Sequence, residues 1–127
     1  MNPMKILVVD DEKDIQTLFE QRFRKEIREK TVELVFAFSG EDALVYLQEH
    51  EQEAVLILSD INMPGMSGLE LLRHIKEDYP KPPSPIVMMI TAYADEENYA
   101  RAKALGADDF LTKPVDFKIL KEKLKLN

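Results

Sequence analysis

The residue of this 127-residue chain best placed to do chemistry is Asp60. The apolar run over residues 55–58 is typical of a buried strand, and Asp60 ends it. Pro64-Gly65 and Ser67-Gly68 then mark a loop. Open α/β sheets place ligand chemistry beyond the carboxyl ends of their strands. An aspartate can equally cap a loop or helix there, so Asp60 alone leaves both functions open.

Polar side chains also follow the other strand-like runs. They are Asp10 and Asp11 after residues 6–9, Thr91 after residues 86–90, and Lys113 after residues 110–112. Because the carboxyl ends of parallel strands share one edge of a sheet, these residues should converge there. Singly, each has a plain alternative: the two aspartates and the threonine could cap helices, and the lysine could be a surface residue.

Together these residues predict phosphoryl transfer onto a carboxylate. Three carboxylates brought together repel each other unless a cation holds them, and oxygen ligands without His or Cys suit Mg²⁺. A hydroxyl and an ammonium beside that cation would spread the charge of a phosphoryl group. The expected product is an aspartyl phosphate.

The elements that position these residues alternate regularly along the chain. Strand patterns cover residues 6–9, 32–36, 55–58, 86–90 and 110–112. Helical stripes are formed by Ile15, Leu18, Phe19, Phe23 and Ile27, by Ala43, Leu44 and Leu47, by Leu69, Leu72 and Ile75, by Tyr99, Ala102 and Leu105, and by Phe117, Leu120 and Leu124. Five strands alternating with five helices predict an α/β, doubly wound (βα)5 fold with right-handed crossovers. We expect a five-stranded parallel sheet in the flavodoxin-like order 2-1-3-4-5 rather than a sequential one.

Composition limits the function classes. The net charge of −7, from 24 acidic and 17 basic residues, disfavours direct nucleic-acid binding. Without Cys there is no disulfide, thiolate metal site or cysteine nucleophile. His50 and His74 are expected on the surface, so a histidine-rich metal site is not expected either.

The chain is expected to be one domain over residues 1–127. No run of about 18 apolar residues is present, so no membrane span is expected. The N-terminus has no signal-peptide layout, which favours a cytoplasmic protein. The segment from Pro82 to Pro85 is interpreted as a stiff helix-to-strand connection rather than a motif for proline-binding domains.

The ordered motifs of the chain resemble one family. They are Val8-Val9-Asp10-Asp11-Glu12, Ser39-Gly40-Glu41-Asp42-Ala43, Asp60 with Met63-Pro64-Gly65-Met66-Ser67-Gly68, Thr91-Ala92, Gly106-Ala107-Asp108-Asp109-Phe110 and Lys113-Pro114. From Lys5 to about Leu126 the sequence is similar to the receiver domain of two-component response regulators, as in chemotaxis regulators. The resemblance implies a phosphorylation switch rather than an enzyme acting on a separate substrate.

The resemblance assigns roles to individual residues. Asp60 would accept phosphate from the phosphohistidine of a sensor histidine kinase or a histidine phosphotransfer protein. Asp11, Asp60 and the backbone carbonyl of Asn62 would bind Mg²⁺ directly, and Asp10 would act through water. Phosphoryl contacts would come from Thr91 and Lys113, the Lys113-Pro114 bond would be cis, and Thr91 and Phe110 would form the switch. Many family members carry Tyr instead of Phe110.

A phosphorylation-dependent homodimer would use the helix after Asp95, the strand at residues 110–112 and the last helix. The output partner or domain, the cognate kinase, and whether the chain is a stand-alone regulator or part of a longer protein are left open.

Three other classes fit less well. A flavodoxin-type FMN protein shares the fold, but Asp10-Asp11-Glu12 would repel a flavin phosphate. Phosphatases of the haloacid dehalogenase type place an Asp-x-Asp nucleophile after their first strand and usually carry a cap. A scaffolding receiver that cannot accept phosphate would normally lack one of the five key residues. All five are present here: Asp10, Asp11, Asp60, Thr91 and Lys113.

Overall fold

The computed structural model describes residues 3–50, 53, 55–80, 84–92 and 95–126. Five parallel strands form one sheet in the order β2-β1-β3-β4-β5. They are β1 (Met4–Val9), β2 (Val32–Ala37), β3 (Leu56–Asp60), β4 (Ile86–Thr91) and β5 (Asp109–Thr112). The predicted flavodoxin-like order is confirmed. Because β2 lies at an edge, only its end residues Val32 and Ala37 are buried, and the predicted alternation of buried and exposed residues is not seen along it.

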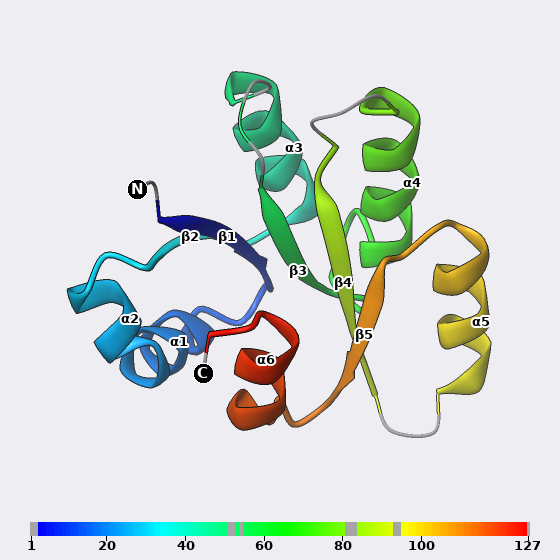
Figure 1. Cartoon of the computed structure of the whole chain (residues 1–127). Coiled ribbons are helices and arrows are strands. Elements are labelled where there is room, and N and C mark those ends of the chain that lie inside the picture. The colour runs from blue at the N-terminus through cyan, green and yellow to red at the C-terminus, as the bar shows by residue number, and fades with distance from the viewer. Residues whose placement is uncertain (1–2, 51–52, 54, 81–83, 93–94, 127) are drawn as a thin grey trace.

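Helices cover both faces of the sheet (Figure 1). They are α1 (Asp14–Arg22), α2 (Arg24–Arg28), α3 (Gly40–Glu49), α4 (Gly68–Asp78), α5 (Glu96–Ala104) and α6 (Phe117–Lys123). One core joins α1 and α6 to Ile6, Val8 and Leu58, and the other joins α3, α4 and α5 to Leu7, Ile57 and Met89. Successive residues of a strand therefore face opposite cores, which explains why the runs at residues 6–9, 56–58 and 86–90 are apolar throughout.

The first helical stretch differs from its prediction. We expected one helix through Ile27, but the chain forms α1 and α2 with a shallow break at Phe23, which explains a sixth helix. Leu18 and Ile27 are exposed, whereas Phe19 and Phe23 are buried. On α2, Glu26 is buried instead and pairs with Lys121 of α6 at 3.1 Å.

The other helical stripes are largely as predicted, but α5 and the two histidines differ from expectation. On α5 only Ala102 is buried, and Tyr99 is 43% exposed. His50 and His74 are half-buried rather than solvated. The ring of His50 stacks on Tyr46 with 4.0 Å between centroids, so packing along α3 holds this histidine.

The proline-rich connection before β4 can be described only in part. Residues 81–83 lie outside the described residues, so its predicted stiffness stays a prediction. Within the described part of the chain, no helix is both long and apolar enough to cross a membrane.

Candidate functional site

The strands deliver several chemically capable side chains to one edge of the sheet, the lower edge in Figure 1. Asp60 and Thr91 are the last residues of β3 and β4. Asp10 and Lys113 directly follow β1 and β5. The parallel register explains this convergence, because each strand ends at the same level of the sheet.

Three carboxylates form the centre of the site. Asp10, Asp11 and Asp60 each offer an oxygen, and these oxygens lie within 4.8 Å of one another. Asp10 and Asp60 are buried, whereas Asp11 is exposed. Buried like charges so close together are unfavourable unless a proton, a cation or an ammonium compensates them.

Asp10 shows the electrostatic cost of this arrangement. Burial is the main factor that raises the pKa of its carboxyl, and the nearby charge of Asp60 adds to this effect. The backbone N–H of Glu12, which donates to Oδ1 of Asp10 at 2.9 Å, and the charge of Lys113 oppose it. No side chain caps α1, so Asp10 and Asp11 are not helix caps.

Lys113 is the counter-charge of Asp60. Its Nζ donates to Oδ2 of Asp60 at 2.6 Å, although the lysine side chain itself is 41% exposed. Burial acts to lower the pKa of the Lys113 ammonium, but the hydrogen bond and charge of Asp60 outweigh it and the net pKa is raised. The ammonium is therefore held charged beside Asp60. The peptide bond between Lys113 and Pro114 is cis, as the resemblance implied.

The loop after β3 wraps around Asp60. The backbone N–H of Asn62 donates to Oδ1 of Asp60 at 3.3 Å, and the N–H of Gly68 donates to the carbonyl of Ile61 at 2.8 Å. Only glycine fits at residue 68, because a Cβ there would collide with the Asp60 carbonyl and lie 2.8 Å from Cα of Ile61. Gly65 takes a positive φ of 74° in the same loop.

Thr91 is available for the site rather than used as a cap. The cap of α5 is Asp95, whose side chain accepts from the N–H of Asn98 at 3.2 Å. The buried hydroxyl of Thr91 donates to the carbonyl of Leu111 at 3.4 Å, a long hydrogen bond across to β5. This hydroxyl can leave Leu111 at a small energetic cost.

Phe110 lies on β5, on the same face of the sheet as Thr91. Its ring contacts the ring of Tyr99 on α5 in a tilted arrangement, with a centroid distance of 4.3 Å. Sequence reasoning missed this contact, because Tyr99 was counted in the apolar stripe of its helix. The sequence carried no signal for this pairing, because helical periodicity does not say which strand residue a helix residue meets.

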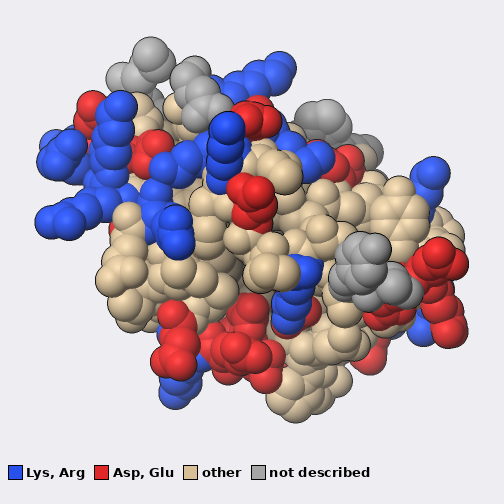
Figure 2. Space-filling model, turned by 90° about the horizontal axis from the view of Figure 1, so that it is seen from below, with Lys and Arg blue, Asp and Glu red and all other residues tan. Residues whose placement is uncertain are grey.

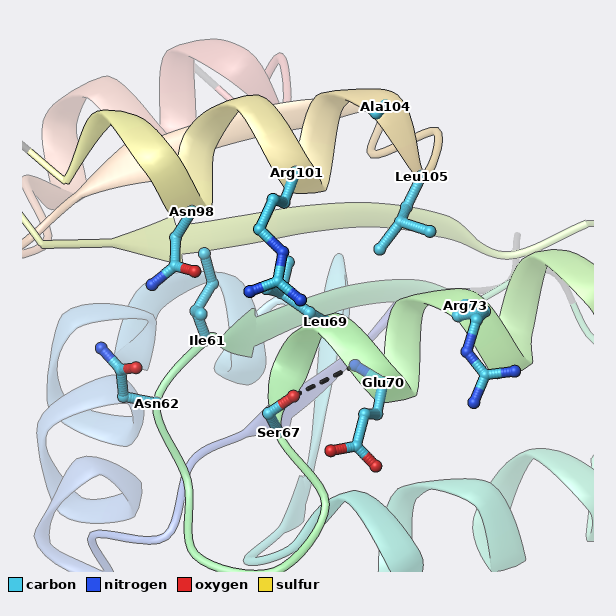
Figure 3. Close-up of a pocket in the computed structure, with 10 residues that line it drawn as sticks. All are labelled: Ile61, Asn62, Ser67, Leu69, Glu70, Arg73, Asn98, Arg101, Ala104 and Leu105. Atoms are coloured by element: carbon cyan, nitrogen blue, oxygen red, sulfur yellow. Dashed lines mark hydrogen bonds between the residues drawn. The ribbon is translucent and has the colours of Figure 1, made fainter.

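A groove between α4 and α5 adjoins the site at Asn62 (Figure 3). It encloses about 630 Å³, and Arg101 points into it from α5. The remaining lining is mixed, with Asn98 and Ser67 beside Ile61 and Leu69. The three acidic ligand candidates, Thr91 and Lys113 do not line it, so it is separate from the acidic centre.

Charge is unevenly distributed over the molecule. Figure 2 looks onto the side where the strands end, and Asp and Glu side chains gather below its centre. Lys and Arg side chains gather instead at the upper left, on the side of α2 in Figure 1. The acidic edge is thus a local feature and not only a result of the net charge of −7.

The donor set at this edge fits a hard divalent cation. It consists of carboxylate oxygens, and Asp11 is open to solvent, which leaves room for water ligands. Mg²⁺ is typically bound by one or two carboxylates, several waters and a phosphate oxygen. The acidic cluster can therefore hold a metal ion of this kind.

Comparison with known proteins identifies the family. The sequence model of the response regulator receiver domain matches residues 6–125. The chain belongs to this family. As its members do, this receiver domain acts in two-component signalling as a switch, not as a classical enzyme, and the family implies a phosphodonor partner such as a histidine kinase.

Solved structures agree with this assignment. The chemotaxis protein CheY4 of Vibrio cholerae is 27% identical with a TM-score of 0.79, and the match covers 98% of each chain. A response regulator receiver protein from Pseudomonas putida is 27% identical with a TM-score of 0.80, covering 100% of this chain and 99% of that one. A protein named as a two-component response regulator with a GGDEF domain is 26% identical with a TM-score of 0.81, covering 97% of this chain and 48% of that one.

Proposed function

We propose that this receiver domain accepts a phosphoryl group on Asp60 in a reaction that depends on Mg²⁺. The observation that carries the proposal is the arrangement around one carboxylate. Lys113 contacts Asp60 at 2.6 Å, and the oxygens of Asp10 and Asp11 lie within 4.8 Å of it. A nucleophile, a counter-charge and a cation site are thus adjacent.

The proposed reaction is a direct transfer from a phosphohistidine of the phosphodonor. An oxygen of Asp60 attacks phosphorus, a P–O bond forms, and the P–N bond to the imidazole breaks. The bonding electrons leave with the imidazole nitrogen, so the donor histidine is regenerated. Lys113 neutralises charge on the phosphoryl oxygens, and the N–H of Asn62 helps to orient the Asp60 carboxylate.

Mg²⁺, when bound, would withdraw negative charge from the transferring phosphoryl group. Asp11, Asp60 and the backbone carbonyl of Asn62 would hold it directly, and Asp10 would act through water. In this proposal the buried Asp10 strengthens cation binding. This role explains why the chain keeps a buried carboxylate that otherwise lowers the stability of the fold.

Phosphorylation would be transmitted through Thr91 and Phe110. The Thr91 hydroxyl would exchange Leu111 for a phosphoryl oxygen on Asp60, and the Phe110 ring would move into the space released. A packed aromatic ring has discrete positions, which suits a switch. The affected surface would be that of α5, β5 and α6.

The proposed partners follow from this chemistry. A sensor histidine kinase or a histidine phosphotransfer protein would supply phosphate, and residues 1–127 would act as one receiver unit. The phosphorylated form would control an output partner or domain, and a homodimer through α5, β5 and α6 stays a prediction. The GGDEF-containing relative supports the view that such receivers can be joined to an output domain.

Phosphorylation of the intact protein tests the acceptor. With a small acyl phosphate and Mg²⁺, intact-mass spectrometry should detect one added phosphoryl group that is absent in Asp60→Asn. Asp78→Asn, which changes an exposed carboxylate at the end of α4, is the matched control and should be modified like the wild type. A phosphoryl group that persists in Asp60→Asn contradicts the assignment.

A further inference from the structure

We infer that Tyr99 is a positioning residue of the switch, because its ring holds Phe110 in the resting position. The inference rests on the proposed role of Asp60 as phosphoacceptor. In this inference a residue of α5 restrains the ring of Phe110, because Phe110, on β5, has no hydroxyl that could anchor it.

The contact itself is close. The ring centroids of Tyr99 and Phe110 are 4.3 Å apart and the ring planes are inclined by 43°. Tyr99 projects from α5 and is 43% exposed, whereas Phe110 is half-buried on β5. Tyr99 is thus the more exposed of the two residues, and Phe110 is only partly covered by the core. Offset and tilted aromatic pairs of this kind are attractive beyond the area they bury.

The surroundings identify this arrangement as the resting one. Thr91 donates its hydroxyl to the carbonyl of Leu111, while the carboxylate of Asp60 is paired with Lys113. A cavity of about 270 Å³ is lined by Thr91, Tyr99, Phe110 and Ile119, among others. The Phe110 ring is therefore not packed on all sides, and its contact with Tyr99 opposes movement toward the space that Thr91 would release.

The contact between Tyr99 and Phe110 should shift the equilibrium between the resting and switched states in one direction only. A contact that is present in the resting state and lost on switching stabilises the resting state alone. Removing it shifts the population toward the switched state, and a ligand that binds that state then binds more tightly by the same factor. For an aromatic pair this factor is about two- to tenfold.

Beryllofluoride, which takes the place of a phosphoryl group on an aspartate, is the probe. We would measure its apparent affinity by calorimetry on the intact protein with saturating Mg²⁺. Tyr99→Ala should bind it about two- to tenfold more tightly than the wild type. Tyr99→Phe keeps the ring and should match the wild type, while Val45→Ala truncates an exposed side chain on α3, away from this cavity, and should change little.

The outcomes separate the two proposals. Wild-type protein that does not bind beryllofluoride would refute the role of Asp60, and the inference about Tyr99 would fall with it. If the wild type binds but Tyr99→Ala binds equally or more weakly, only the inference about Tyr99 is overturned. Tyr99→Leu, which fills more of the space than Tyr99→Ala but has no aromatic ring, should also bind beryllofluoride more tightly than the wild type.

Amide NMR without beryllofluoride adds a readout that a general loss of packing would not produce. In Tyr99→Ala, signals from Thr91 and Phe110 should move part of the way along the line that joins the free and beryllofluoride-bound wild type. Movement off that line, or no movement, contradicts the population shift.

Discussion

At the scale of single residues, the site contains clustered charges that lower the folding stability of the metal-free protein. Asp10 is 6% exposed and lies in a cluster with Asp11 and Asp60, while the ammonium of Lys113 contacts Asp60 and not Asp10 among the described ion pairs. A carboxylate in such a place is expected to destabilise the metal-free protein. Its presence is explained if its charge serves to bind a cation.

Replacing Asp10 by Asn should therefore stabilise the metal-free protein near neutral pH. The pKa of Asp10 is raised above its usual value of 3.8, so the folded state binds this proton more tightly than the unfolded state. Stability is then lost as pH rises from about 3.8 through the raised pKa, and Asp10→Asn escapes that loss. Thermal unfolding with chelator should show the advantage of Asp10→Asn growing with pH across this window. An advantage that is constant or shrinks with rising pH contradicts this explanation.

At the scale of elements, the start of α4 is fitted against the end of β3. The helix begins one residue after its cap Ser67, and Gly68 lies against the backbone of Asp60 and Ile61. The start of α3 has the same local sequence, Ser39-Gly40, but Gly40 faces the flexible side chain of Met66. The same dipeptide thus has different packing constraints in its two positions.

Gly68→Ala should be clearly more destabilising than Gly40→Ala. The added methyl group collides with backbone at residue 68 and would cost about 1–3 kcal/mol of unfolding free energy. At residue 40 the nearest atom is the Met66 sulfur at 2.9 Å, which can move away. Urea unfolding of both variants decides the point, and equal losses would mean that the approach of α4 to β3 is not constrained as described.

At the scale of the whole molecule, the acidic edge should respond to cations as a unit. The chain carries a net charge of −7, and the carboxylates at the strand ends concentrate part of it in one place. A cation that binds the folded state alone stabilises it through mass action. Folding stability and Mg²⁺ concentration are therefore coupled.

We expect Mg²⁺ to raise the melting temperature of the wild type, and a hundredfold excess over Kd corresponds to about 2.7 kcal/mol. Asp11→Asn should melt higher than the wild type without Mg²⁺, because one like charge is gone, and should gain less from Mg²⁺. Glu12→Gln removes a neighbouring charge outside the cluster and is the control. Differential scanning calorimetry over a Mg²⁺ series would contradict the cation site if Asp11→Asn gains as much as the wild type.

The sequence by itself determined the class of fold and the chemistry of the edge. Alternating apolar strand and helix patterns require a covered parallel sheet, and such a sheet brings the residues after its strands together. Asp10, Asp60, Thr91 and Lys113 could be assembled on this ground alone, because topology and not side-chain detail places them.

Only the tertiary structure decided which local alternatives hold and which rings meet. The cap of α5 is Asp95 and not Thr91, since hydrogen-bond geometry depends on where the chain turns. The break at Phe23, the burial of Glu26 and the contact between the rings of Tyr99 and Phe110 depend on how helices lie against the sheet. Helical periodicity describes one helix at a time, and contacts between elements are set by packing that no single stretch of sequence contains.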